Sequence, residues 1–215
     1  IAGNRERDLH NRFTLPPKIT PRQIWDALCA PWWTLDYFTS PAITYANYAA
    51  KTKAASLARF FAEQLHAGFN WTDAEWLLGE WNGTSVLKGV VSPDDVAKAA
   101  SIGFDGVMIS NHGGRQLDAS PAPIDMLRPI RDRIGNDAEL IIDGGIRRAT
   151  DIIKAMSLGA NAVSFARPYL YGLAAGGQKG VERALDVFVT GLKRDMVLTG
   201  AHSIAELNEN YIRAK

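Results

Sequence analysis

Residues 106–118, GVMISNHGGRQLD, decide how this chain is interpreted. The run opens with GVMI, which is typical of a buried strand, and passes directly into a loop that carries a histidine, two glycines and an arginine. His112 can take up a proton near neutral pH, and Arg115 offers a planar fork suited to a carboxylate. The glycines between them allow both side chains to converge on one small molecule. The pattern indicates proton abstraction beside a carboxylate, and the alternative is a structural loop capped by Asn111.

Strand-like and helix-like runs alternate on both sides of this loop. We expect strands at 85–90, 106–110, 139–143 and 162–166, and helices at 92–103, 123–135, 147–160 and about 176–199. Ser92 and Pro93 are typical of a helix start, and Pro129 is expected to kink or divide its helix. Short, continuous apolar runs are typical of parallel strands buried on both faces. Four successive strand–helix units predict an α/β fold with a parallel sheet and right-handed crossovers, of the kind that builds barrels.

Functional residue types stand at the end of each expected strand. They are Lys88 at the end of the first, Ser110, Asn111 and His112 at the end of the second, Asp143, Gly144 and Gly145 at the end of the third, and Ala166 and Arg167 at the end of the fourth. In a barrel of alternating strands and helices, the carboxyl ends of the strands form the active face. The sequence therefore predicts a site at this edge.

The third and fourth strand ends carry the pattern of a phosphate site. Gly144 and Gly145 would let the backbone approach a phosphate closely. Arg147 and Arg167 would add charge-assisted hydrogen bonds. The alternative is a glycine turn with two surface arginines.

Lys88 admits three interpretations, namely a Schiff-base lysine, a cation beside a cofactor, or a rim residue whose charge reaches water. The histidines at positions 10, 66 and 202 lie in charged or helical surroundings. Because no second histidine or cysteine stands at ligand spacing from His112, no metal site is expected.

Residues 1–84 differ from the rest of the chain in composition and in hydrophobic pattern. All six tryptophans lie there, and no strand pattern is visible. Short helical pieces broken by prolines are expected around 16–38, and another helix at 70–81 with Asn70 or Thr72 as its cap.

Composition limits the function classes. The 24 basic and 23 acidic residues leave a net charge of +1, which argues against a general nucleic-acid surface. The single cysteine, Cys29, excludes an internal disulfide, favours a reducing compartment and is expected to be an inert packing residue. No signal peptide is visible and no apolar run reaches about 20 residues. We expect a cytoplasmic protein, possible association with the inner face of a membrane, and a chain taken from a longer protein.

Four motifs resemble one known family. LKGV (87–90), SNHGGRQLD (110–118), DGGIRRATD (143–151) and ARPYLYGLAAGG (166–177) occur in the order and spacing of the FMN-dependent α-hydroxy-acid dehydrogenases and oxidases. These include glycolate oxidase, L-lactate dehydrogenases and oxidases, and mandelate dehydrogenases. GNRERDLHNRF (3–13) resembles the segment after the family's barrel strand four. The resemblance spans nearly the whole chain and is weakest over 25–70.

The resemblance implies a TIM barrel that carries FMN. Residues 1–84 would be the loop and helical region after strand four, and residues 85–215 would supply strands five to eight and the C-terminal helix. The implied activity is oxidation of an L-2-hydroxy acid, such as lactate, glycolate or mandelate, to the 2-oxo acid. His112 would be the base, removing either the hydroxyl proton or the α-proton. Arg115 and Arg5 would bind the substrate carboxylate.

The cofactor residues follow from the same motifs. Lys88 would stabilise negative charge on the reduced flavin and Ser110 would touch the ring. The ribityl and phosphate groups would lie against Asp143, Gly144, Gly145, Arg147, Ala166 and Arg167. Ala166 departs from the family's glycine, and its methyl group could crowd a backbone N–H aimed at phosphate.

The larger departure is the absence of the family's first four strands. The resemblance implies that an N-terminal half completes the barrel and that the protein is a homo-oligomer, a tetramer in the resembling proteins. The aromatic region from Trp25 to Phe61, in which Lys51, Lys53 and Arg59 follow the aromatic residues, would either touch a membrane surface or cover the active-site mouth. The alternative is a folded loop buried against the barrel. Two rival interpretations stay open. One is a barrel isomerase or aldolase with Lys88 as a Schiff base, and the other is a non-catalytic half-barrel.

Overall fold

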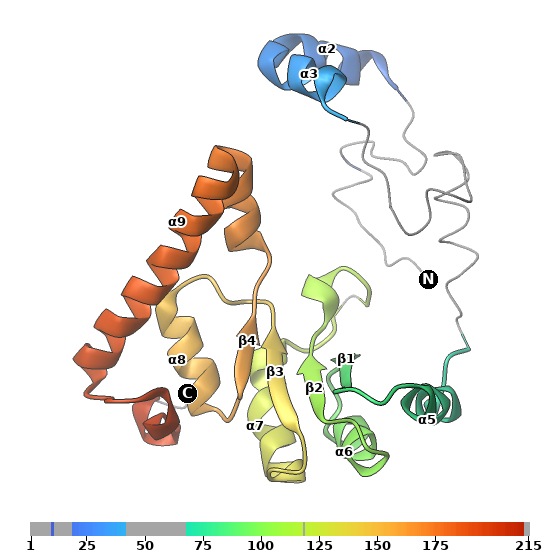
Figure 1. Cartoon of the computed structure of the whole chain (residues 1–215), viewed down its shortest axis with the longest axis vertical. Coiled ribbons are helices and arrows are strands. Elements are labelled where there is room, and N and C mark those ends of the chain that lie inside the picture. Colours follow the sequence, from blue (N-terminus) through green and yellow to red (C-terminus); the bar gives the residue numbers. More distant parts are fainter. Residues whose placement is uncertain (1–9, 11–18, 42–67, 118, 213–215) are drawn as a thin grey trace. The chain divides into compact units, whose positions relative to one another are not determined.

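The computed structural model describes residue 10 and residues 19–41, 68–117 and 119–212. The chain divides into two compact units, Ile1–Phe69 and Asn70–Lys215, which are drawn in Figure 1. This boundary differs from the sequence-based division at 84/85. The reason is that the helix after Asn70 packs on the second unit, where Trp71 contacts the hydrophobic core and Glu75 lies 3.7 Å from the Lys98 ammonium.

The described part of the first unit consists of two short helices, α2 (Pro21–Cys29) and α3 (Pro31–Thr39). Each begins with a proline, which agrees with the expectation of short helical pieces broken by prolines. Neither helix buries a residue. Cys29 is exposed, so the expectation that it is a packing residue is wrong for this part of the chain.

The second unit alternates strands and helices in the predicted order (Figure 1). Its elements are α5 (Trp71–Glu80), β1 (Val86–Val90), α6 (Pro93–Ser101), β2 (Gly106–Ile109), η1 (His112–Gly114), α7 (Pro123–Ile134), β3 (Glu139–Asp143), α8 (Ala149–Ser157), β4 (Ala162–Ser164), α9 (Arg167–Thr199), η2 (Ile204–Glu206) and η3 (Glu209–Tyr211). The strands form one sheet in the order β1-β2-β3-β4, and every neighbouring pair is parallel. The predicted parallel α/β sheet is confirmed.

The helix starts follow from local capping. The Asn70 side chain accepts hydrogen bonds from the backbone at 72 and 73, so Asn70 is the cap of α5. Ser92 caps α6 ahead of Pro93, as predicted. Helix α7 runs through Pro129 as one helix, so the expected division there is absent.

The core lies between the sheet and its helices. Val107, Ile109, Leu140 and Ile142 are buried on one face of β2 and β3, together with side chains of α6 and α7. Their alternating neighbours Met108 and Ile141 are only partly buried, and successive strand residues point to opposite faces. The expectation of strands buried on both faces therefore holds for one face of the described sheet.

Helix α9 begins earlier than the sequence indicated. Strand β4 ends at Ser164, so Ala166 is the N-cap of a helix that starts at Arg167. Gly176 and Gly177 have non-helical dihedral angles, which divide α9 into two helical segments. Both segments are visible as a bend in the orange and red part of Figure 1.

Candidate active site

Lys88 lies in the middle of β1 rather than at its end. It pairs with Met108 of β2, and the register then slips at Gly89, whose φ of +100° is a left-handed value that favours glycine. The bulge is followed by Val90, the last residue of the strand. Bulges commonly re-aim a side chain next to a site, and here Lys88 is aimed at the ends of β2 and β3.

Four side chains, one from each strand or the residue after it, form a hydrogen-bonded group that we term the strand-end cluster: Lys88, Ser110, Asp143 and Ser164. The Lys88 Nζ lies 2.7 Å from the Asp143 Oδ2 and 2.9 Å from the Ser110 Oγ. Ser110 donates its hydroxyl proton to the Asp143 Oδ2 at 2.6 Å, and Ser164 donates to the Oδ1 at 3.0 Å. The sequence predicted the first three members but not Ser164, whose one signal was a hydroxyl inside an apolar run.

The cluster keeps its carboxylate ionised. Burial alone would raise the pKa of Asp143, but the hydrogen bonds from Lys88, Ser110 and Ser164 and the charge of Lys88 outweigh burial and lower the pKa. A carboxylate with three donors is stabilised in its charged form. Lys88 is about half exposed, so its charge faces the open edge.

The His112 loop is attached to the same cluster through its backbone. The His112 N–H donates to the Ser110 Oγ at 3.1 Å, and the Asn111 side chain caps Gly114 N at 3.2 Å. His112 has a φ of +56°, followed by two glycines that are also left-handed. A non-glycine residue with positive φ is uncommon, and such strain concentrates at functional sites.

The side chains of His112 and Arg115 are both exposed. Neither the imidazole nor the guanidinium has a hydrogen-bond partner within the part of the chain that the structure describes. The structure therefore brings the backbone of this loop to the cluster, while both side chains point to no described partner. Arg5, the second predicted carboxylate anchor, lies outside the described residues.

The turn after β3 leaves backbone donors available. Gly144 and Gly145 have φ values of +88° and +78°, and the Gly144 N–H donates to the Ser164 carbonyl at 3.1 Å. The N–H groups of Gly145 and, at the start of α9, of Arg167 and Tyr169 have no acceptor among the described residues. Donors of this kind bind anions.

Two arginines flank these donors. Arg147 and Arg167 are exposed, and the Arg147 backbone is held by the Asp151 carboxylate at 2.9 Å. Ala166 has a φ of −115°, a value that any residue adopts, so the alanine is unstrained at the position where the family has glycine.

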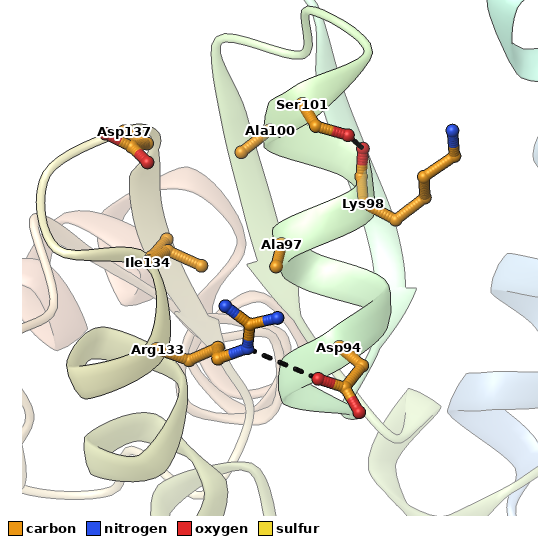
Figure 2. A pocket seen from close by; sticks show the side chains of 8 residues that line it. All are labelled: Asp94, Ala97, Lys98, Ala100, Ser101, Arg133, Ile134 and Asp137. Carbon is orange, nitrogen blue, oxygen red and sulfur yellow. Dashed lines mark hydrogen bonds and ion pairs between the residues drawn. The ribbon is translucent and has the colours of Figure 1, made fainter.

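Two hollows lie away from this edge. One, of about 490 Å³, lies between α6 and α7 and is crossed by the Arg133–Asp94 ion pair of 3.3 Å (Figure 2). The other, of about 710 Å³, is lined by residues of α7, α8 and α9 and by Tyr211 and Ile212. Neither is lined by a predicted site residue. Among the described residues, no group of three or more His, Cys, Asp or Glu side chains is placed to hold a metal ion.

Fold and site together define a class: part of a parallel α/β barrel whose strand ends carry a hydrogen-bonded lysine and backbone N–H groups that have no acceptor among the described residues. Comparison with known proteins agrees with this class. The family model described as FMN-dependent dehydrogenase matches residues 1–214. The chain belongs to the FMN-dependent dehydrogenase family.

Individual relatives are similar over almost all of the chain. (S)-mandelate dehydrogenase of Pseudomonas putida is 36% identical over 215 residues, covering 99% of this chain and 54% of the relative. A putative L-lactate dehydrogenase of Mycobacterium tuberculosis is 34% identical over 212 residues, covering 99% and 51%. A solved structure of the monotopic membrane protein (S)-mandelate dehydrogenase superposes with a TM-score of 0.94 at 35% identity, covering 100% of this chain and 58% of that one. The chain thus spans about half the length of the curated relatives it matches.

The described residues fit FMN. The unpaired N–H groups beside Gly145 and at the start of α9, with Arg147 and Arg167, suit its phosphate. Lys88 suits the electron-rich edge of its ring. A Cβ added at Gly144 or Gly145 would meet nothing within 4 Å, so space is open in front of this turn.

Proposed function

We propose that the whole protein oxidises an L-2-hydroxy acid to the 2-oxo acid, with FMN as the primary electron acceptor and a substrate that resembles lactate, glycolate or mandelate. The observation that carries the proposal is the Lys88 ammonium held between Asp143 and Ser110 at the strand ends. An ammonium has three protons to donate. Two are used in the cluster, so one is left for a bound cofactor.

FMN, when bound, supplies the two-electron acceptor for the reaction. Lys88 places a positive charge beside it. His112 takes the proton that leaves the substrate, since an imidazole can act as a general base near neutral pH. Arg115, together with Arg5, holds the substrate carboxylate through a planar, bidentate contact.

The same contacts argue against the aldolase alternative. A Schiff-base lysine must present a neutral amine to its substrate. Lys88 instead donates to the Asp143 carboxylate at 2.7 Å and to the Ser110 hydroxyl at 2.9 Å, so two of its hydrogen-bonding directions are engaged within the chain rather than facing a substrate carbonyl.

The test is steady-state turnover by the full-length protein with both enantiomers of lactate and mandelate, and with glycolate, using an artificial electron acceptor. We expect a bound flavin that is bleached by the L-2-hydroxy acids and not by the D-enantiomers. Lack of flavin, together with trapping of a phosphorylated aldehyde or ketone on Lys88 by borohydride, would replace this proposal with the aldolase alternative.

We also propose that α2 and α3 contact a membrane surface. The two helices expose an aromatic and aliphatic group that we term the α2–α3 patch: Ile24, Trp25, Leu28, Trp32, Trp33, Leu35, Tyr37 and Phe38. Tryptophan and tyrosine favour the bilayer interface. The solved mandelate dehydrogenase described as a monotopic membrane protein supports this proposal. Within the described residues, no helix is both long enough and apolar enough to cross a bilayer.

The charges near the patch predict how it binds. The described residues of these helices carry one basic residue, Arg22, and two acidic residues, Asp26 and Asp36. Attraction to anionic lipid cannot come from this segment. We therefore expect these two helices to bind by apolar insertion, whereas Lys51, Lys53 and Arg59, which follow them in the sequence and would favour anionic lipid, lie outside the described residues.

Vesicle flotation tests the patch. Replacing Trp32 and Trp33 by serine in the full-length protein should weaken partitioning into zwitterionic vesicles at least about tenfold, since more than ~1.4 kcal/mol of apolar burial is lost. The matched control replaces Trp76 and Trp81, which lie outside the patch and are each 62% exposed. Equal partitioning of both variants and the parent would leave the patch as a packing surface or a lid.

A further inference from the structure

Ser164 is a member of the strand-end cluster that none of the recognised motifs includes. It is the last residue of β4, and its Cα pairs with that of Asp143 in the parallel register. We propose that Ser164 is a positioning residue for Lys88, acting through Asp143. The inference rests on the function proposed above for this site.

The two carboxylate oxygens of Asp143 have different partners. The Oδ2 accepts hydrogen bonds from the Lys88 ammonium and the Ser110 hydroxyl. The Oδ1 accepts a hydrogen bond only from the Ser164 hydroxyl among the described residues. Contacts to one oxygen leave the carboxylate plane free to turn about its last bond. The hydroxyl on the other oxygen fixes that plane, and so fixes the direction from which Lys88 is held.

The contacts from Ser164 through Asp143 orient the Lys88 ammonium. With two ammonium protons directed to Asp143 and Ser110, the third has one remaining tetrahedral direction. Ser110 also accepts the His112 N–H at 3.1 Å. A change in the Asp143 plane would therefore shift both the ammonium and the anchor of the histidine loop.

The position of Ser164 makes this role separable from folding. Its carbonyl accepts the Gly144 N–H at 3.1 Å, and this backbone bond is kept when the side chain is changed. Ser164→Ala removes one hydroxyl and leaves the strand pairing intact. Ser164→Thr keeps the hydroxyl on a residue suited to a strand.

The first measurement does not depend on flavin or turnover. The rate at which an amine-reactive acylating reagent labels Lys88 is followed by mass spectrometry in the full-length protein, with Lys154 of α8 as the internal reference. We expect Ser164→Ala to raise the Lys88 rate at least about threefold relative to Lys154, because a side chain released from its fixed contacts with Asp143 and Ser110 is reached by the reagent from more directions. Ser164→Thr should restore the parent rate.

The matched control is Ser157→Ala. Ser157 is 4% exposed, and its hydroxyl has no hydrogen-bond partner among the described residues. This variant also removes a serine hydroxyl from a buried position. Its Lys88 should be labelled at the same rate as in the parent protein. An unchanged Lys88 rate in Ser164→Ala overturns the inference, and so does an equal rise in Ser157→Ala.

The second measurement is the two-electron midpoint potential of the flavin in the holoenzyme. Ser164→Ala should weaken binding of reduced relative to oxidised FMN about three- to tenfold, which lowers the potential by about 15–30 mV. The shift should vanish in the Lys88→Met background, and a shift of equal size in that background overturns the route through Lys88. Faster Lys88 labelling in a protein that binds no FMN would overturn the proposed function while leaving the Ser164–Asp143–Lys88 relation in place.

Discussion

At the scale of single residues, His112 combines an exposed imidazole with a backbone that few side chains adopt. Its φ of +56° is strained, and its N–H is fixed to Ser110 at 3.1 Å. Strain is maintained only where the surroundings determine the conformation. The loop therefore presents the histidine from a defined backbone, which is what a base must have to meet one proton of a small substrate.

We predict that His112→Asn lowers kcat by at least about 10²-fold, the usual contribution of a general base, while FMN stays bound. Asparagine is chosen because it tolerates left-handed backbone better than alanine. Steady-state kinetics and flavin titration of the full-length protein measure the two effects separately. Activity within tenfold of the parent would contradict the assignment of His112 as the base.

We predict that Arg115→Lys damages substrate binding far more than FMN binding. Lysine keeps the charge but loses the fork that engages both carboxylate oxygens. The loss of a charged hydrogen bond costs about 1.5–3 kcal/mol, or roughly 10- to 150-fold in kcat/KM. Arg183→Lys, on an exposed part of α9, is the control. A variant that loses flavin while its remaining holoenzyme turns over normally would make Arg115 a cofactor residue.

At the scale of elements, the two ends of the sheet have different chemistry. The carboxyl ends carry the strand-end cluster and the unpaired backbone donors. At the other end, Arg131 of α7 donates to the Gly159 carbonyl at 2.8 and 2.9 Å and to the Asn161 side chain at 2.5 Å. These bonds tie α7 to the turn between α8 and β4. The division follows the rule that barrels keep function at the carboxyl ends and stability at the amino ends.

The cluster joins all four strands at the carboxyl edge of the sheet, so its charge state should affect stability with a defined sign. Because the pKa of Asp143 is lowered in the folded protein, its contribution is present above the unfolded pKa of about 3.9 and is lost as pH falls through the folded pKa. We predict that Asp143→Asn destabilises the apoprotein at pH 7 and that the difference from the parent shrinks below about pH 4.

Urea midpoints measured between pH 3 and pH 7 test this prediction. Asp94→Asn is the control, because the Asp94 side chain is 88% exposed and its ion pair with Arg133 lies on the helix layer. It should change the midpoint less at every pH. If the urea midpoint of Asp143→Asn lies as far below that of the parent at pH 3 as at pH 7, the substitution removes packing and not charge.

At the scale of the whole molecule, β1 and β4 are the outer strands of an open sheet and have no further neighbour among the described residues. Open parallel edges favour pairing with further strands, and the curated relatives are nearly twice as long. One face of the sheet is also only partly covered. These observations favour a complete barrel as the unit that binds cofactor and substrate.

We predict that residues 1–215 alone bind FMN at least about tenfold more weakly than the same residues within a complete barrel, a difference of about 1.4 kcal/mol or more. Flavin fluorescence quenching measures both affinities. The control is the 215-residue chain co-expressed with a segment equivalent to the relatives' N-terminal half, which should recover the affinity. Equally tight binding by the 215-residue chain alone would contradict the prediction.

Much of the fold was predictable because strand and helix signals are local. Each of these signals depends on a few neighbouring residues. Examples are the apolar runs around Val107 and Leu140, the helix caps Asn70 and Ser92, and the glycines after Asp143. The predicted parallel sheet follows from these runs and their spacing, whereas the family was indicated by the resemblance of four short motifs. Helix ends were less predictable, and Arg167 begins a helix where a strand end was expected, because the end of a short strand depends on its partner.

The sequence by itself determined the alternation of elements, the family and the presence of Lys88, His112 and Asp143 at one edge of the sheet. Only the tertiary structure decided how these residues meet. The Lys88–Asp143 contact joins positions 55 residues apart, and Ser164 enters the cluster because the β3–β4 register places it opposite Asp143. A local pattern carries no information about register across strands, since register depends on packing of the whole sheet against its helices.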